Sequence, residues 1–457
     1  MFNFKNYRNY LKRLLIIAVP MILSHLINQL QMLIDRIFLG HADTLYMSVL
    51  GNVSFPVWTT MAVCFSISTG ASILISQNVG ADKKEKVEEF AGSLIKYNNI
   101  LPLGLFFLWF FASKPVYRLM GVSENLLPMC EDYSRYYAPV FILVGFYASF
   151  MVIFQTSNHT KHLAISSFIR SVLNIFLDWV LIFGKLGFPA MGIKGAAIGT
   201  TIAEYAGGIY TLIAFYKSRK LGTRPNFAAI FKSRFKSYLH SAKLGINTAL
   251  EDLFWNLGNL AIIRILNSIN ELAAGIYTIV FGVEIIAIVV IGSLGSGTMT
   301  LSSEAVGKHD LRLYRGITRT AYSLCILIAL AMVITALLFP QQIIAIFTKD
   351  QGIIATSGIY LLFIGINLFS KAGNIIVGNV IRGSGDTRWM FFTQIFGTFF
   401  VVAMACLFVF GLKLGITGVF LAVMSDEAVR FVINTLKYRR ICKSADFFEP
   451  EKEHLSA

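Results

Sequence analysis

The chain has 457 residues, of which 56% are hydrophobic and 14% charged, and its mean hydropathy is +0.66. A soluble chain would carry roughly 25% charged residues, so the composition excludes a soluble globular protein. The formal net charge of +15 would suggest a nucleic-acid partner in a soluble protein, but here the Lys and Arg residues lie between apolar segments, as in membrane-protein loops. The five cysteines are scattered and form no CxxC motif, so haem, zinc and iron–sulfur sites have no support.

Apolar segments of about 20 residues, enough to cross a bilayer as a helix, recur along nearly the whole chain. The first begins in "KNYRNYLKRLLIIAVP", which could pass for a signal peptide, but its apolar run continues to Gly40 without a small-residue cleavage site, so we expect a retained helix. The predicted spans, in chain order, are approximately 14–39, 50–77, 92–113, 136–156, 163–184, 191–216, 240–266, 272–302, 316–340, 354–381, 389–411 and 414–436.

The distribution of basic residues predicts the topology. If both termini are cytoplasmic, most Lys and Arg residues fall in inner loops and tails, as the positive-inside rule requires. The densest basic segment, residues 216–243, is expected to be an orienting, lipid-facing linker. We therefore expect a multi-pass protein of the plasma (inner) membrane.

The two halves of the chain repeat one another at a constant offset of 227 residues, as between Gly80 and Gly307. One offset in several separate regions predicts a duplicated six-helix unit. Because six is even, the halves should be related by a pseudo-two-fold axis along the membrane normal, with a cavity between them. Other pairs at this offset are Gly70 and Gly297, Ser157 and Ser384, Thr160 and Thr387, and Gly184 and Gly411. The predicted parts are an N-lobe (1–216), a cytoplasmic basic linker (217–239), a C-lobe (240–436) and a cytoplasmic tail (437–457).

One apolar segment, "RSVLNIFLDWVLIFG" (170–184), carries Asn174 and Asp178 one helical turn apart, so that both face the same way. An ionised carboxylate inside hydrocarbon costs at least ~2.5 kcal/mol even on lenient insertion scales, and such residues are functional by default. Asp178 is therefore expected to have a function; the alternative is that it holds helices together through hydrogen bonds.

Five stretches of the sequence together resemble the prokaryotic multidrug and toxic compound extrusion (MATE) family. The resemblance covers essentially the whole chain and implies an all-α, twelve-helix, two-lobed membrane protein. It implies a secondary antiporter, not an enzyme, that exports small organic, often cationic compounds in exchange for H⁺ or Na⁺ by alternating access, with no further cofactor. We expect a monomer that contacts lipid and has no nucleic-acid partner. The stretches are "IAVPMILSHLINQLQMLIDRIFLGH", "ISQNVGADKKEKV", "SVLNIFLDWVLIFG", "GIKGAAIGTTIAEY" and "IRGSGDTRW".

Carried over by position, the family's N-lobe cation site falls on Asp35, Asn174, Asp178 and Thr200. Depth supports this assignment, since Asp35 and Asp178 lie about five and six residues from the outer ends of their spans, or roughly 7–9 Å. Two close carboxylates in a low dielectric need a proton or a cation, and Asn174 and Thr200 add neutral oxygens suited to Na⁺. Glu204, one turn after Thr200, is a possible cavity charge.

The second lobe departs from the family pattern. Lys371 stands where the branch with a C-lobe cation site has an Asp, and at the 227 offset Asp35 and Asp178 correspond to Ile262 and Ala405. The coupling ion is therefore expected only in the N-lobe. Lys371 could pair with an acid, meet an anionic substrate or extend toward the inner surface. Its possible acidic partners, which are also possible cavity charges, are Glu251, Asp252 and Glu284.

Other charges within the predicted spans leave questions open. Arg36 follows Asp35 but points about 100° away from it on a helix. Asp426, Glu427 and Arg430 could either fix helix packing or line a cavity.

Three other functions are less consistent with the sequence than transport. "GSGD" (383–386) matches a motif of intramembrane aspartyl proteases, but that chemistry needs two aspartates facing each other within helices, whereas Asp386 lies at a predicted helix end between Arg382 and Arg388. A channel is disfavoured by the duplicated halves and the lack of a filter sequence. The serious alternative is a flippase for a lipid-linked or polyprenyl-linked precursor, for which Arg264 and Lys371 are the only supporting charges.

Overall fold

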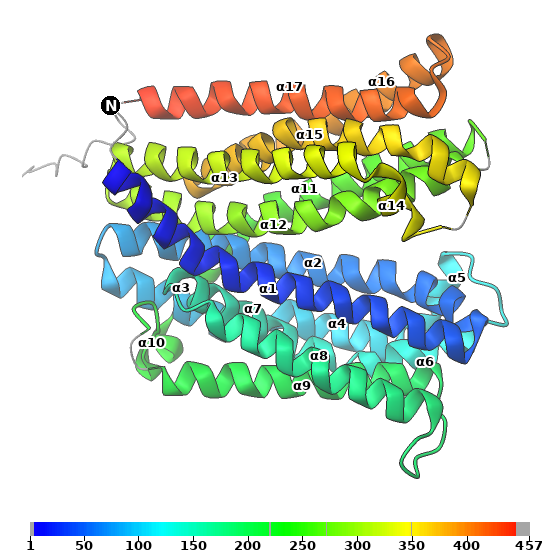
Figure 1. The fold of residues 1–457 in the computed structure, drawn as a ribbon. Helices are drawn as coiled ribbons and strands as arrows, with labels where there is room; N and C mark the ends of the chain where they lie inside the picture. Colours follow the sequence, from blue (N-terminus) through cyan, green and yellow to red (C-terminus); the bar gives the residue numbers. More distant parts are fainter. Residues whose placement is uncertain (1–3, 219–220, 271, 349, 445–457) are drawn as a thin grey trace, which may run out of the picture. The chain divides into compact units, whose positions relative to one another are not determined.

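A computed structural model describes residues 4–218, 221–270, 272–348 and 350–444, and all regular structure in these residues is helical (Figure 1). The predicted fold class, an all-α membrane protein, is therefore confirmed in the described part of the chain. The helices are α1 (Phe4–Ala42), α2 (Thr44–Gly80), α3 (Lys84–Tyr97), α4 (Ile100–Phe111), α5 (Ser113–Leu119), α6 (Leu127–Tyr137), α7 (Val140–Thr156), α8 (Lys161–Phe183), α9 (Ile193–Lys217), α10 (Phe227–Lys232), α11 (Phe235–Asn267), α12 (Ala273–Gly307), α13 (Leu311–Leu338), α14 (Pro340–Ala345), α15 (Gln351–Gly383), α16 (Thr387–Cys406), η1 (Leu407–Gly411) and α17 (Gly415–Lys443).

Each of the twelve predicted spans coincides with a helix or a pair of helices. The third span is divided between α3 and α4, and the fourth between α6 and α7, which bend by 47°. By length and composition, eight helices of the described residues can cross a membrane, or nine when the bent pair counts as one span. The helices α9, α11 and α17 are long enough as well, with 25, 33 and 29 residues.

The chain divides into two compact units. The N-terminal unit comprises Val19–Ile75 and Lys83–Ala249, and the C-terminal unit comprises the described parts of Met1–Ala18, Ser76–Asp82 and Leu250–Ala457. The start of α1 and the end of α2 thus belong to the C-terminal unit, and α10 and the start of α11 to the N-terminal unit. The lobe boundaries derived from the sequence remain a prediction, and part of the predicted tail and linker lies outside the described residues.

Within the C-terminal unit, two glycines related by the sequence repeat let helices cross in contact. A Cβ atom on Gly80 would collide with the backbone of Glu304 on α12, and one on Gly307 would collide with the backbone of Gln77 on α2. Only glycine permits such a close backbone approach. The repeat signal at this pair therefore has a packing cause.

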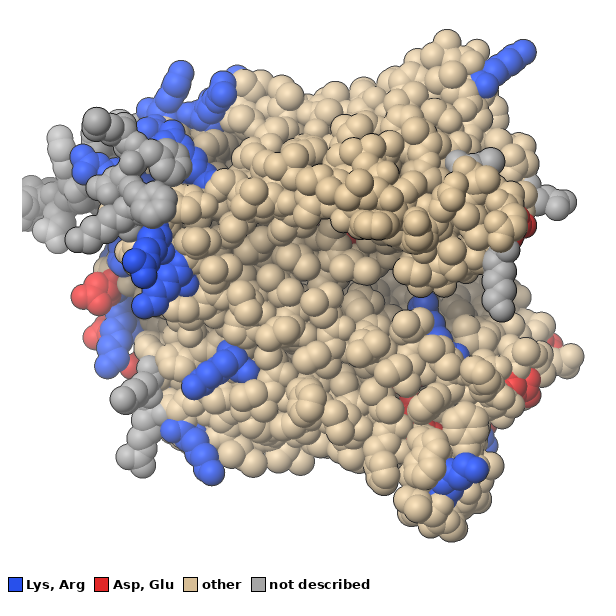
Figure 2. Space-filling model, in the orientation of Figure 1, with Lys and Arg blue, Asp and Glu red and all other residues tan. Residues whose placement is uncertain are grey.

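Basic side chains gather at particular ends of each unit. In the C-terminal unit Lys and Arg side chains lie where α1 begins and α17 ends, and in the N-terminal unit they lie near α3 and α10 (Figure 2). Between these ends the helices expose large apolar side chains, such as Phe168 (60% exposed) and Phe399 (68%). A surface of this kind is suited to lipid rather than to water.

Candidate functional site

A ladder of polar contacts joins α1 to α8 within the N-terminal unit. On α1 the contacting residues recur every three or four positions, which places them on one helix face. Polar pairs of this kind hold helices together inside a membrane, where apolar contact alone gives little preference. From one end of the ladder to the other the pairs are Ser24 with Ser167 (2.6 Å), Asn28 with Arg170 (3.4 Å), Gln31 with Ser171 (2.8 Å) and Asp35 with Asp178.

The last pair of the ladder is the centre of the predicted cation site. Asn174 Nδ2 donates to Asp178 Oδ1 at 3.3 Å and to Thr200 Oγ1 on α9 at 3.2 Å. The carboxyl groups of Asp35 and Asp178 lie close enough to interact, and the side chains of Asn174 and Asp178 are fully buried. The structure therefore brings all four predicted residues into one cluster formed by α1, α8 and α9.

A glycine on α9 makes room for this cluster. A Cβ atom on Gly199 would lie 2.5 Å from Asp178 Oδ1, a distance that a real methyl group could not occupy. Because Gly199 has no side chain, α9 approaches the carboxyl group closely and brings Thr200 within hydrogen-bond distance of Asn174.

The cluster has acceptor oxygens to spare. In the described part of the chain, Asp35 Oδ1, Asn174 Oδ1 and Asp178 Oδ2 are buried and have no hydrogen-bond partner. Burying a polar atom without a partner costs about 1–3 kcal/mol, so these atoms favour a bound cation or proton. Oxygen ligands of this kind suit a hard cation such as Na⁺, whereas a hydrogen bond between two carboxyl groups requires a proton on one of them. The geometry thus fits either coupling ion.

A second buried charge lies two helical turns from Asp178, and the sequence analysis did not single it out. Arg170 Nη1 contacts Glu204 Oε2 of α9 at 2.7 Å and Oε1 at 3.0 Å, and its guanidinium also lies over the ring of Tyr147 on α7. The spacing of residues 170, 174 and 178 was the available signal, because positions four apart share a helix face. Glu204, predicted as a cavity charge, is therefore balanced by Arg170.

Two basic residues named from the sequence lie away from these clusters. Arg36 and Arg264 are both exposed, and neither forms an ion pair with any described residue. Arg36 follows Asp35 in sequence but, as the helical geometry predicts, it does not neutralise that carboxyl group.

In the C-terminal unit, Lys371 has an acidic partner. Its Nζ atom lies 2.6 Å from Glu284 Oε1, and both residues are buried. Glu251, another predicted partner, instead forms an ion pair with Arg382, while Asp252 is exposed. Of the three acids named from the sequence, Glu284 is thus the one that Lys371 contacts.

Arg430 organises the remaining buried charges of the C-terminal unit. Its guanidinium contacts Asp426 at 2.7 Å, Glu427 at 3.3 Å and the side-chain oxygen of Gln394 at 2.9 Å. Asn374 donates to the second oxygen of Glu427 at 3.0 Å. These contacts tie α17 to α15 and α16. Asp386 belongs to a different feature, since it caps α16 through the backbone N–H of Trp389.

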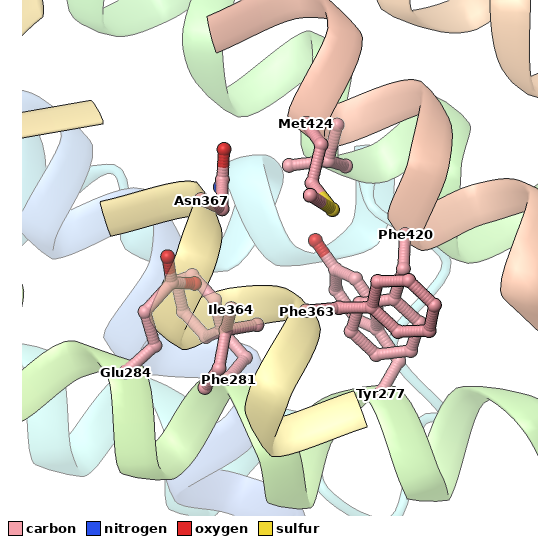
Figure 3. A pocket seen from close by; sticks show the side chains of 9 residues that line it. Tyr277, Phe281, Glu284, Phe363, Ile364, Asn367, Phe420 and Met424 are labelled. Atoms are coloured by element: carbon pink, nitrogen blue, oxygen red, sulfur yellow. The ribbon is translucent and has the colours of Figure 1, made fainter. Parts of the chain in front are cut away.

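A small aromatic pocket opens beside these charges in the C-terminal unit, between α12, α15 and α17 (Figure 3). Glu284 of α12 and Asn367 of α15 both lie on its wall. The other lining residues are Tyr277, Phe281, Phe363, Ile364, Phe420, Val423 and Met424.

Long apolar helices with buried carboxyl groups between them define the class of this molecule, a multi-pass α-helical membrane protein with ionisable groups inside its spans. The sequence model of the MatE family matches residues 20–180 and 248–407. The two matches fall in the two halves of the repeat, and together they cover more than half of the chain. The protein belongs to the MatE family, the family of MATE transporters.

Individual relatives extend the match along the chain. The chain is 27% identical over 417 residues to "Uncharacterized transporter YisQ" of Bacillus subtilis (strain 168), covering 88% of this chain and 90% of that protein. It is 26% identical over 448 residues to "Probable multidrug resistance protein NorM" of Thermotoga maritima, covering 94% of each.

A solved structure shares the fold. The outward-facing conformation of a multidrug resistance MATE family transporter of the MOP superfamily superimposes with a TM-score of 0.86 at 20% identity, covering 96% of this chain and 97% of that one. At this identity the likeness concerns the fold alone, and the predicted twelve-helix architecture fits it.

Proposed function

We propose that this protein is a secondary antiporter that exports organic, cationic compounds from the cell in exchange for H⁺ or Na⁺. Relatives named as multidrug resistance proteins support the drug-extrusion part of this proposal. The observation that carries the coupling part is the Asp35–Asp178 carboxyl pair, whose cluster leaves three buried oxygens without a hydrogen-bond partner among the described residues.

In the proposed cycle, Asp178 and Asp35 bind the coupling ion when the site faces outward, where the ion is more concentrated. Neutralising the pair removes the cost of holding two carboxylates in a low dielectric, so the ion-bound and ion-free states differ in free energy. Alternating access uses that difference, because a ligand shifts a conformational equilibrium only by its differential affinity for the two states.

Arg170 has a supporting role in this proposal. By pairing with Glu204 it removes a nearby carboxylate that would otherwise compete for the coupling ion. The exchange site is thereby confined to Asp35 and Asp178, with Asn174 and Thr200 as neutral ligands. In this scheme the basic ends of the two units lie on the cytoplasmic side of the plasma membrane, as the positive-inside rule predicts.

The test uses purified protein in liposomes loaded with ethidium, a cationic dye. Inward Na⁺ and H⁺ gradients are imposed separately, and dye efflux is followed by fluorescence. We expect efflux driven by at least one gradient and abolished by an ionophore that dissipates it. Dye movement that is independent of both gradients would contradict the proposal of antiport.

A further inference from the structure

The aromatic pocket of the C-terminal unit is small. Its cavity volume is about 10 Å³, which is room for roughly one water-sized group. Four aromatic residues line it, Tyr277 and Phe281 from α12, Phe363 from α15 and Phe420 from α17, and the rings of Tyr277 and Phe420 lie 5.5 Å apart. Faces of aromatic rings attract cations, and cages of such rings are a known means of binding organic ammonium groups.

Polar acceptors in the same wall strengthen the case for a cationic ligand. Asn367 is 3% exposed, and its Oδ1 atom has no hydrogen-bond partner among the described residues. Glu284, likewise 3% exposed, lies on the same side of the pocket (Figure 3). A buried oxygen without a partner costs free energy, so this wall favours a hydrogen-bond donor.

The buried charges beside the pocket do not balance. Glu284, Asp426 and Glu427 are acids, whereas only Lys371 and Arg430 are bases, so the formal charge of the five groups is −1. These groups form one cluster, because Lys371 interacts with Glu427 as well as with Glu284. A net charge buried in a membrane protein is costly unless it is compensated. The cluster can therefore accept one further positive charge.

We propose that this pocket binds the –NH₃⁺ group of an organic amine. An ammonium group is about the size of a water molecule and has three N–H donors. Glu284 and Asn367 Oδ1 accept hydrogen bonds from it, and the surrounding rings contribute cation–π attraction. Lys371 shows that Glu284 can bind an ammonium group, since the Nζ atom of Lys371 already contacts the Glu284 carboxylate. That this amine is the exported compound rests on the antiport function proposed above.

This geometry discriminates between related compounds. A trimethylammonium group is too large for the cavity and has no N–H donor, while a carboxylate would meet Glu284 with the same charge. Lys371 competes with an incoming amine for Glu284, so removing its charge should tighten amine binding. If the pocket instead served an anion, removing Lys371 would weaken binding.

The experiment measures binding to the purified full-length protein in lipid nanodiscs by titration calorimetry. Three probes share one aromatic tail: phenethylamine, its N,N,N-trimethyl derivative and phenylacetate. We expect phenethylamine to bind at least about tenfold more tightly than the other two, since a hydrogen bond to a charged group is worth about that much.

Four variants locate the binding to the pocket. Glu284→Gln and Asn367→Leu should each weaken phenethylamine binding about tenfold or more, and Lys371→Met should strengthen it. Glu304→Gln is the matched control, because Glu304 lies on the same helix but pairs with Arg13 away from the pocket. Asn367→Leu changes no charge, so it tests the proposal even if Glu284→Gln fails to fold.

The results separate this proposal from the antiport hypothesis. Equal affinity for all three probes, or unchanged phenethylamine affinity in Asn367→Leu, overturns the amine site even if ethidium efflux remains coupled to a gradient. Weaker phenethylamine binding in Lys371→Met overturns it as well. Selective amine binding without any gradient-driven efflux by the wild-type protein would uphold the site and contradict antiport.

Discussion

The two halves of the sequence repeat handle buried charge in different ways. At the offset of 227 residues, Asp35, Asn174 and Asp178 of the N-terminal unit correspond to Ile262, Val401 and Ala405 of the C-terminal unit. The latter three belong to one buried hydrophobic cluster. Conversely, Gly199 and Thr200 correspond to Asp426 and Glu427. Acids on α1 and α8 in one unit are thus replaced by acids on α17 in the other.

The buried arginines show the same exchange. Arg170 on α8 packs over Gly207 of α9, whereas Arg430 on α17 packs over Gly397 of α16, and position 397 is the repeat counterpart of 170. In both units an arginine thus fills the space above a glycine of a neighbouring helix. In the N-terminal unit the arginine is on the first helix of the pair, α8, and in the C-terminal unit it is on the second, α17. Duplication preserved the packing and left the placement of charge free to diverge.

This difference assigns different tasks to the units. In the N-terminal unit the base is paired with Glu204, and Asp35 and Asp178 form no ion pair with any described residue. In the C-terminal unit Glu284, Asp426 and Glu427 each contact a base. Only the first arrangement leaves carboxyl groups without a basic partner, so coupling should depend on one unit.

The largest effect is expected from Asp178→Asn. The amide keeps the shape and an acceptor oxygen, so the protein should fold, with less desolvation cost than the acid. Ethidium efflux driven by either gradient should fall to the level of protein-free liposomes, because without the second carboxyl group there is no close pair of acids for the ion to neutralise, and the site loses its differential affinity for the ion. Asp43→Asn, at a half-buried position between α1 and α2, is the control. Wild-type rates in Asp178→Asn would leave the residue a purely structural role.

Much of this architecture could be predicted from the sequence. Each of the twelve spans predicted from apolar length falls on a helix or a pair of helices, and the spacing of Asn174 and Asp178 predicted that they share one helix face. Side-chain partners on different helices are harder to predict, because the rotation and contacts of each helix depend on packing that cannot be read simply from one sequence. The sequence therefore does not predict the Arg170–Glu204 pair, and it allows Lys371 three possible acidic partners.

Repeat-related positions also proved unequal in detail. Gly184 ends α8 in a left-handed conformation with φ of 67°. Its counterpart Gly411 ends the π-helical turn η1, and positive φ angles fall instead on Lys413 and Gly415. Sequence correspondence identifies the helix end in both cases, but the local backbone depends on how each turn packs.

Replacing each arginine by methionine tests how strongly the units depend on internal pairing. Arg430→Met leaves Asp426 and Glu427 buried without their base, which should destabilise the protein by about 3–5 kcal/mol. Arg170→Met should cost less, about 1–3 kcal/mol, because the Glu204 side chain is 25% exposed. Thermal unfolding midpoints should therefore rank wild type above Arg170→Met and Arg170→Met above Arg430→Met.

A rescue variant isolates the cause of that instability. Adding Asp426→Asn and Glu427→Gln to Arg430→Met removes the unpaired charges while keeping side-chain shape, and it should recover much of the lost stability. Failure to recover would mean that packing over Gly397, rather than charge, dominates the contribution of Arg430.

A smaller effect is expected at the glycine beside the cation site. In Gly199→Ala the new methyl group would lie 2.5 Å from Asp178 Oδ1, so the carboxyl group or α9 must shift, at a cost of about 1–3 kcal/mol. Efflux should be slowed while the folded protein is still made. Gly208→Ala is the matched control on α9, since its nearest neighbour is the flexible end of Leu143 at 3.2 Å. Equal rates in the two variants would contradict the proposed close approach.

The smallest effect should come from Asn174→Ala, and the gradient under which efflux falls distinguishes the two coupling ions. Asn174 donates to Asp178 and Thr200, and its Oδ1 atom lies buried without a hydrogen-bond partner in the described residues. Removing it deletes one neutral oxygen ligand but leaves the carboxyl pair that accepts a proton. Efflux driven by a Na⁺ gradient should therefore weaken several-fold, roughly the effect of losing one hydrogen-bonding group, while efflux driven by a pH gradient should change little. When both gradients are applied to the same liposome preparation, each measurement serves as the control for the other. Equal loss under both would show that Asn174 acts by positioning Asp178, because a ligand specific to Na⁺ cannot impair proton coupling to the same extent.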